Sequence, residues 1–177
     1  MRLEQKYFYP FMGVCAAISL VLILFGTFHY QDRQHQRFTE HLATIDFDTL
    51  RFDFANGSNE LHLRELRGKP IVIDFWSTWS DMSMSNHNHL QRIKNQYPEL
   101  EVVAVAVRDS RELVQDYVEE QSYPFYFVIG TGFYEAVQVP GLPSQLMIDR
   151  NLKLFDKQIG IGVSELEEKL MSLIRDE

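Results

Sequence analysis

The sequence predicts an α/β fold in which a mixed central sheet carries helices on both faces, preceded by one membrane-spanning helix. Three observations lead to this prediction. An apolar run at 7–30 contains no Asp, Glu, Lys or Arg. Two continuous apolar strands, at 71–75 and 102–107, flank a helical stretch, which is the pattern of parallel strands joined by a crossover helix. The chain then closes with a strand pair and a helix.

The apolar run at 7–30 is expected to anchor the protein in a membrane after a short tail at 1–6. As a helix it would be about 36 Å long, enough for a tilted bilayer crossing. The run is long for a cleaved signal peptide, and no A-x-A pattern follows it. We therefore expect an uncleaved signal anchor in the cytoplasmic membrane. A slight excess of positive charge before the run places the remaining chain on the periplasmic side.

Charge and cysteine content narrow the possible partners. The formal net charge of −8 argues against nucleic acid as a partner. The sequence holds one cysteine, Cys15, inside the apolar run, so no intramolecular disulfide can form. We interpret Cys15 as a small apolar residue of the membrane helix.

A polar juxtamembrane linker is expected at 31–45, and a folded domain at 46–177. The domain opens with strands on either side of Asn56-Gly57, a dipeptide typical of hairpin turns. The strand at 71–75 is apolar except for Asp74, which suits a buried central strand.

The remaining elements alternate between helices and strands. Helices are predicted at 83–96, after Asp109 and after Ser164. Glu112 and Glu167 complete a capping box for the second and third of these helices.

Strands are predicted at 102–107 and 124–129, and an antiparallel pair at 144–148 and 152–158 encloses the turn at 149–151.

Three motifs carry a resemblance to a known family. Phe75-Trp76-Ser77-Thr78-Trp79 resembles the strand-to-helix junction of thioredoxins, which there runs straight into Cys-x-x-Cys. Residues 63–70 match the pattern L-x-x-L-x-G-K-P, and residues 141–149 match G-x-P-x-x-x-x-I-D. Together they resemble membrane-anchored thiol–disulfide oxidoreductases of the TlpA/ResA type over roughly residues 46–177. The resemblance implies a thioredoxin-like fold, with Pro143 in the cis form and facing the active-site positions.

Those positions hold Ser80 and Ser83 in place of the two cysteines. A thiolate is the attacking group in disulfide exchange, and a serine hydroxyl cannot form a disulfide. Met82, Asn86 and Asn88 also depart from the family, which there often has proline, glutamate and proline.

Asp74 matches the buried acid of thioredoxin. It is either a relic or a structural group that hydrogen-bonds a neighbour. An engineered Cys→Ser double variant would explain the retained acid but not the other departures.

These features favour a redox-inactive binding or structural subunit of a membrane assembly, with no cofactor. Its partners would be the membrane and other membrane or periplasmic proteins. The candidate contact residues are Trp79, Met82 and Leu142 around Pro143. A second candidate patch comprises Phe133 and Tyr134, in a segment, 130–134, that reads as an exposed apolar loop.

Two alternatives stay open. One is a thiol–disulfide oxidoreductase of the cytochrome c maturation type, seen as a Cys-to-Ser variant. The other is a periplasmic copper carrier, because thioether and imidazole groups suit copper. Its candidate ligands are Met82, Met84, His87 and His89. The two histidines would diverge by about 200° on a helix, which weighs against a shared metal site.

Overall fold

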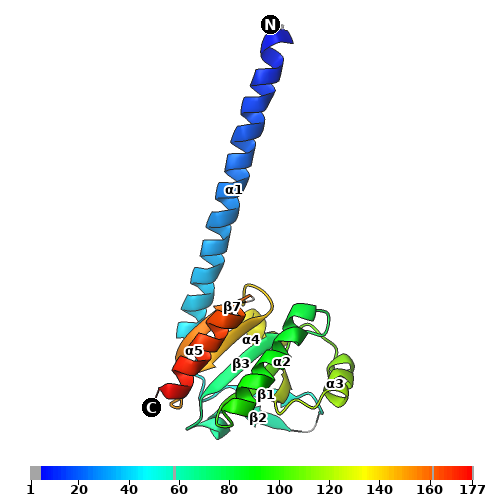
Figure 1. The fold of residues 1–177 in the computed structure, drawn as a ribbon, viewed down its shortest axis with the longest axis vertical. Helices are drawn as coiled ribbons and strands as arrows, with labels where there is room; N and C mark the ends of the chain where they lie inside the picture. The colour runs from blue at the N-terminus through cyan, green and yellow to red at the C-terminus, as the bar shows by residue number, and fades with distance from the viewer. Residues whose placement is uncertain (1–4, 58, 161, 177) are drawn as a thin grey trace.

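The computed structural model describes residues 5–57, 59–160 and 162–176. In this part of the chain one sheet is surrounded by helices, and a long N-terminal helix projects away from the folded body (Figure 1). In chain order the elements are α1 (Gln5–Ala43), β1 (Arg51–Phe54), β2 (Glu60–His62), the 3-10 turn η1 (Leu63–Leu66), β3 (Ile71–Trp76), α2 (Asp81–Gln96), β4 (Glu101–Ala106), α3 (Arg111–Glu120), β5 (Tyr126–Ile129), α4 (Thr131–Ala136), β6 (Ser144–Ile148), β7 (Leu154–Ile159) and α5 (Val163–Arg175).

The sheet is mixed, as the sequence predicts. Its seven strands run in the order β2-β1-β5-β4-β3-β6-β7. β3, β4 and β5 are parallel, and the other neighbouring pairs are antiparallel. Every residue of β3 and β4 is buried, which is why these strands read as continuous apolar runs rather than as alternating patterns.

Helices cover both faces of the sheet, which confirms the predicted fold class. On one face, Phe75 and its neighbours in β3 pack with α4 and the end of α1. On the other face, Val72 and Trp76 pack beneath α2, α3 and α5. Because side chains alternate along a strand, Asp74 faces the same side as Val72 and Trp76.

The first helix differs from its prediction. The expected linker at 31–45 is not a separate segment, because α1 continues through it to Ala43. Phe38 and Leu42 are fully buried in the domain core, so the last turns of α1 belong to the domain. Their spacing of four residues places them on one face of the helix. This apolar pair, within an otherwise polar stretch, indicates that the helix packs on the domain.

The apolar part of α1 is the one helix among the described residues that is long and apolar enough to cross a membrane, and its most apolar stretch is wholly unburied. Residues 1–4 of the expected tail lie outside the described residues, and residues 5 and 6 already belong to α1.

Both predicted capping boxes are wrong. α3 is capped by Ser110, whose Oγ accepts a hydrogen bond from Leu113 N–H at 3.3 Å. The Asp109 carboxylate instead accepts hydrogen bonds from the loop after β3. α5 is preceded by Gly162 without a side-chain cap, and Ser164 lies inside its first turn.

Candidate functional site

The two serines lie side by side at the start of α2. Ser80 is the N-cap of this helix, and its Oγ accepts hydrogen bonds from Ser83 N–H at 3.3 Å and from Ser83 Oγ–H at 2.8 Å. Ser83 is fully buried and Ser80 is 8% exposed. The pair is therefore satisfied internally, as a helix cap rather than as a reactive group.

Asp109 holds the loop that leads to the serines. Its Oδ2 accepts from Ser77 Oγ–H at 2.8 Å and from Thr78 N–H at 2.7 Å, and its Oδ1 accepts from Thr78 Oγ1–H at 2.9 Å. The loops after β3 and β4 meet because these strands are parallel neighbours. Sequence reasoning assigned Asp109 to a helix cap, and only the strand order reveals its true partners.

Pro143 lies beside α2, and the peptide bond Leu142–Pro143 is cis, as the resemblance implies. Strand β6 follows directly and pairs with β3, with Ser144 opposite Phe75. A small cavity of about 50 Å³ separates buried Pro143 from α2. Met82, Asn86 and His89 contribute to its lining.

Large apolar side chains surround this corner of the molecule. Trp79 is 63% exposed, Met82 is 49% exposed, and Val163 at the start of α5 is 44% exposed. Leu142 is half-buried. Trp76, by contrast, is fully buried, so Trp76 is a core residue and Trp79 is a surface residue.

Asp74 is fully buried in β3, and one of its two carboxylate oxygens accepts hydrogen bonds from amide groups. Its Oδ1 accepts from Gln145 Nε2–H at 2.7 Å and from Asn86 Nδ2–H at 3.2 Å. Its Oδ2 lies 3.2 Å from His87 Nε2, although the two atoms are not aligned as a hydrogen bond. Of the two roles considered for Asp74, the structure supports the structural one.

His87 is enclosed by aromatic rings. Its Nδ1 lies 2.8 Å from the Tyr117 hydroxyl oxygen. Burial, then the neighbouring Tyr123 hydroxyl and the charge of Asp74, raise the pKa of the Tyr117 hydroxyl, so this group stays protonated. The rings within 6 Å of the imidazole centroid belong to Trp76, Tyr117, Tyr123, Phe125 and Phe127.

His89 has different surroundings. Its Nδ1 lies 2.6 Å from Arg92 Nη2. A guanidinium can only donate, so Nδ1 accepts and the neutral ring carries its hydrogen on Nε2. Burial and the neighbouring Arg92 charge lower the pKa of His89, which favours this neutral form. Nε2 is buried and has no hydrogen-bond partner among the described residues, although His89 lines the cavity beside Pro143.

The four candidate copper ligands are not brought together. His87 lies in the aromatic enclosure, His89 faces the cavity with Met82, and Met84 packs against the cluster around Trp76. No group of three or more His, Cys, Asp or Glu side chains able to hold a metal occurs in the part of the chain that the structure describes.

The prediction of an exposed loop at 130–134 is wrong. The segment contains the start of α4, and Tyr134 is only 8% exposed. Phe133 packs on Phe52 and Phe75 with ring centroids 5.5 and 5.7 Å apart. These rings fill the space over the sheet, so Phe133 and Tyr134 belong to the core rather than to a surface patch.

Comparisons with known proteins agree with this architecture. The family model for Redoxin matches residues 38–170. The thiol-disulfide oxidoreductase ResA of Halalkalibacterium halodurans is 25% identical over 98% of this chain and 98% of its own length. ResA of Bacillus subtilis is 26% identical over 68% of this chain and 69% of its own length.

Solved structures show the same fold. The thioredoxin domain of a thiol-disulfide oxidoreductase from Bacteroides vulgatus has a TM-score of 0.62 at 16% identity, covering 71% of this chain and 93% of that chain. A secreted Mycobacterium tuberculosis disulfide oxidoreductase has a TM-score of 0.60 at 17% identity, covering 72% of this chain and 98% of that chain. The match begins at Phe38, the residue with which α1 enters the core. With its thioredoxin-like sheet and cis-proline in place, the chain belongs to the Redoxin family and is of the TlpA/ResA type.

Proposed function

We propose that this protein is a redox-inactive, membrane-anchored member of its family that binds an extended segment of another protein beside Pro143. The observation that carries the proposal is the Ser80–Ser83 pair, hydrogen-bonded and buried at the two positions where exchange chemistry needs sulfur. Cys15, the only cysteine of the sequence, lies exposed in the apolar part of α1 and not in the domain.

The surface around the serines supports binding. Met82 lines the cavity beside the cis-proline, Trp79 is exposed just before α2, and aromatic and methionine side chains are enriched at protein interfaces. An extended chain also presents backbone carbonyl groups, which need donors. The Nε2–H group of His89 is a donor without an acceptor, and an unmade hydrogen bond of a buried group costs about 1–3 kcal/mol. A bound carbonyl oxygen would remove that cost.

The absence of exchange chemistry is tested by turnover. The full chain should neither reduce insulin nor oxidise a dithiol peptide above background, and the same should hold for Cys15→Ala. Turnover that survives Cys15→Ala would refute the redox-inactive assignment.

Binding is tested by photo-crosslinking in membranes. A photoreactive amino acid in place of Trp79 should give a discrete crosslinked product. The same amino acid in place of Leu113, which is 53% exposed on α3, should not. His89→Phe keeps a ring of similar shape and removes the donor, so it should reduce the crosslink from position 79 while the circular dichroism spectrum stays unchanged. Equal crosslinking from positions 79 and 113 would contradict a binding surface beside Pro143.

A further inference from the structure

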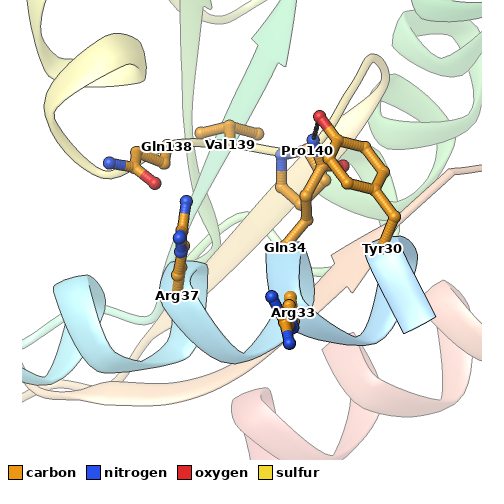
Figure 2. A pocket seen from close by; sticks show the side chains of 7 residues that line it. All are labelled: Tyr30, Arg33, Gln34, Arg37, Gln138, Val139 and Pro140. Atoms are coloured by element: carbon orange, nitrogen blue, oxygen red, sulfur yellow. Dashed lines mark hydrogen bonds between the residues drawn. The ribbon is translucent and has the colours of Figure 1, made fainter. Parts of the chain in front are cut away.

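A second cavity lies between α1 and the segment that follows α4, away from the serines. Its volume is about 290 Å³. Figure 2 shows Arg37 extending from α1 toward Gln138, and Tyr30 and Gln34 extending toward Pro140, while Arg33 lies over the helix itself. The lining residues are Tyr30, Arg33, Gln34, Arg37, Gln138, Val139 and Pro140.

The lining is cationic in an acidic protein. It contains two arginines and no carboxylate, whereas the whole chain carries a net charge of −8. Neither Arg33 nor Arg37 forms an ion pair with any described residue. Gln34 and Gln138 add amide groups, and Gln34 Nε2–H donates to the Tyr30 hydroxyl at 2.8 Å. Such a lining fits an anion with several oxygen acceptors, because guanidinium groups bind phosphate through directed, charge-assisted hydrogen bonds.

Both walls of the cavity are held in place by contacts with the domain. Phe38 and Leu42 are fully buried, and His41 Nδ1 lies 2.9 Å from the carbonyl oxygen of Ala136. Val137 and Val139 are buried on either side of Gln138, which adopts a positive φ of 55°. The cavity is therefore formed before any ligand arrives, which limits the ordering cost of binding.

If the apolar run of α1 crosses a bilayer, the cavity comes close to the lipid head groups. Tyr30 ends the apolar run, so a rise of 1.5 Å per residue places Arg33 and Arg37 about 5 and 10 Å beyond it. The polar layer on each side of a bilayer is about 5–8 Å thick. Arg33 thus falls within this layer, and Arg37 lies just beyond it, at a distance that an arginine side chain can span.

We propose that this cavity binds the phosphate-bearing head group of an anionic phospholipid, with Arg37 and Arg33 as the charged contacts and Gln34 and Gln138 as additional donors. The proposal rests on the membrane anchoring assumed in the proposed function. A lipid held between α1 and the segment 138–140 would fix the height of the domain above the bilayer.

The test uses the full chain, purified in a mild detergent, with bound lipid counted by native mass spectrometry. Titration with phosphatidylglycerol should load one molecule per chain at concentrations where phosphatidylcholine does not load. Arg33→Gln with Arg37→Gln should weaken this binding about tenfold or more, equivalent to ~1.4 kcal/mol. Arg51→Gln with Arg64→Gln removes the same charge from exposed positions at the β2 end of the sheet and should leave binding unchanged.

A second variant tests whether lipid binding needs the whole cavity or only the charges of the two arginines. Gln138→Gly removes one donor at a position whose positive φ suits glycine, so the backbone should be undisturbed. It should weaken phosphatidylglycerol binding several-fold. Unchanged binding in both cavity variants, or equal loading of phosphatidylcholine, would overturn the proposal.

Glycerol phosphate without acyl chains distinguishes a lipid from a free phosphate ligand. If it competes at the same concentration as phosphatidylglycerol, the lipid assignment is wrong. Trp79→Ala with Met82→Ala should retain the lipid, so failure of the protein-binding proposal is distinguishable from failure of this one.

Discussion

At the scale of single residues, Ser80 and Ser83 have a structural role at the start of α2. Ser80 Oγ accepts two hydrogen bonds from Ser83, so it both caps α2 and satisfies a buried hydroxyl. Serine is among the preferred N-cap residues, and replacing such a cap by alanine typically costs about 1 kcal/mol. The junction therefore has its own structural reason to hold serine at position 80.

The same geometry predicts that the scaffold can still hold a disulfide. The Ser80 and Ser83 hydroxyl oxygens are 2.8 Å apart, so the two side chains already point toward each other, as the two sulfurs of a disulfide must. Ser80→Cys with Ser83→Cys, made in a Cys15→Ala background, should form an intramolecular disulfide under mild oxidant. Mass spectrometry after alkylation should show two protected thiols, whereas Ser83→Cys alone should be fully alkylated after unfolding. An oxidised double variant that still alkylates at both positions would show that the backbone has drifted from the family's geometry.

Part of the site could be predicted from residues alone. The motifs identified Ser80, Ser83 and Pro143, because those positions stand at fixed offsets from a strand. They did not identify the partners of Asp74, since Asn86 and Gln145 come from α2 and β6 and meet it only in the folded sheet. The free donor of His89 depends on its contact with Arg92, for which the sequence offers no pattern.

At the scale of elements, strands followed prediction better than helix ends did. Continuous apolar runs identify central strands because both faces are covered. A helix cap, in contrast, forms only if its side chain is not hydrogen-bonded elsewhere in the fold. Asp109 is not a cap because it accepts hydrogen bonds from Ser77 and Thr78. α4 escaped prediction because it is short, contains Gly132, and is held by aromatic packing rather than by its own periodicity.

Glu101 joins three of these elements and gives a pH-dependent test. Its carboxylate contacts Lys69 Nζ before β3 at 2.5 Å and Lys94 Nζ on α2 at 2.9 Å. Burial opposes ionisation of Glu101, but the hydrogen bonds from Lys69 and Lys94 outweigh it and hold the pKa of the carboxyl below its usual value. The hydrogen bond and charge of Glu101 in turn raise the pKa of Lys69.

A lowered carboxyl pKa stabilises the fold above the unfolded value of about 4.3, and this contribution is lost as pH falls through the folded pKa. Glu101→Gln should therefore lower the free energy of unfolding by about 1–2 kcal/mol at pH 7, where charge-assisted hydrogen bonds are lost. The difference from the parent protein should shrink as the pH falls below 4. Urea unfolding at several pH values measures it, with exposed Glu99→Gln as the control. A deficit that stays constant down to acid pH would show that packing, not charge, is responsible.

At the scale of the whole molecule, α1 joins the apolar run, a candidate membrane span, to the domain core as one unbroken helix. The helix is continuous from the apolar run to Phe38 and Leu42, so the domain cannot turn freely beneath its anchor. This continuity was not predictable from composition, because the polar stretch at 31–45 resembles a linker. If the apolar run anchors the domain, a proposed partner in the same bilayer is met at a raised effective concentration, which would offset a weak contact around Trp79.

The arginines after the span bear on which side of the membrane the domain occupies. Arg33 and Arg37 oppose the positive charge before the span, Arg2 and Lys6, and so reduce the bias toward a cytoplasmic N-terminus. If they serve a lipid site, they are kept for binding despite this cost. An export-dependent reporter fused at the C-terminus should be active, and a reporter that works only in the cytoplasm should be silent there. Arg33→Gln with Arg37→Gln should raise the exported fraction or leave it complete, because the charge asymmetry then favours the same orientation more strongly. Arg2→Gln with Lys6→Gln should lower it. A C-terminal reporter active only in the cytoplasm would place the domain, its Pro143 surface and its partners on the opposite side of the membrane from the one proposed.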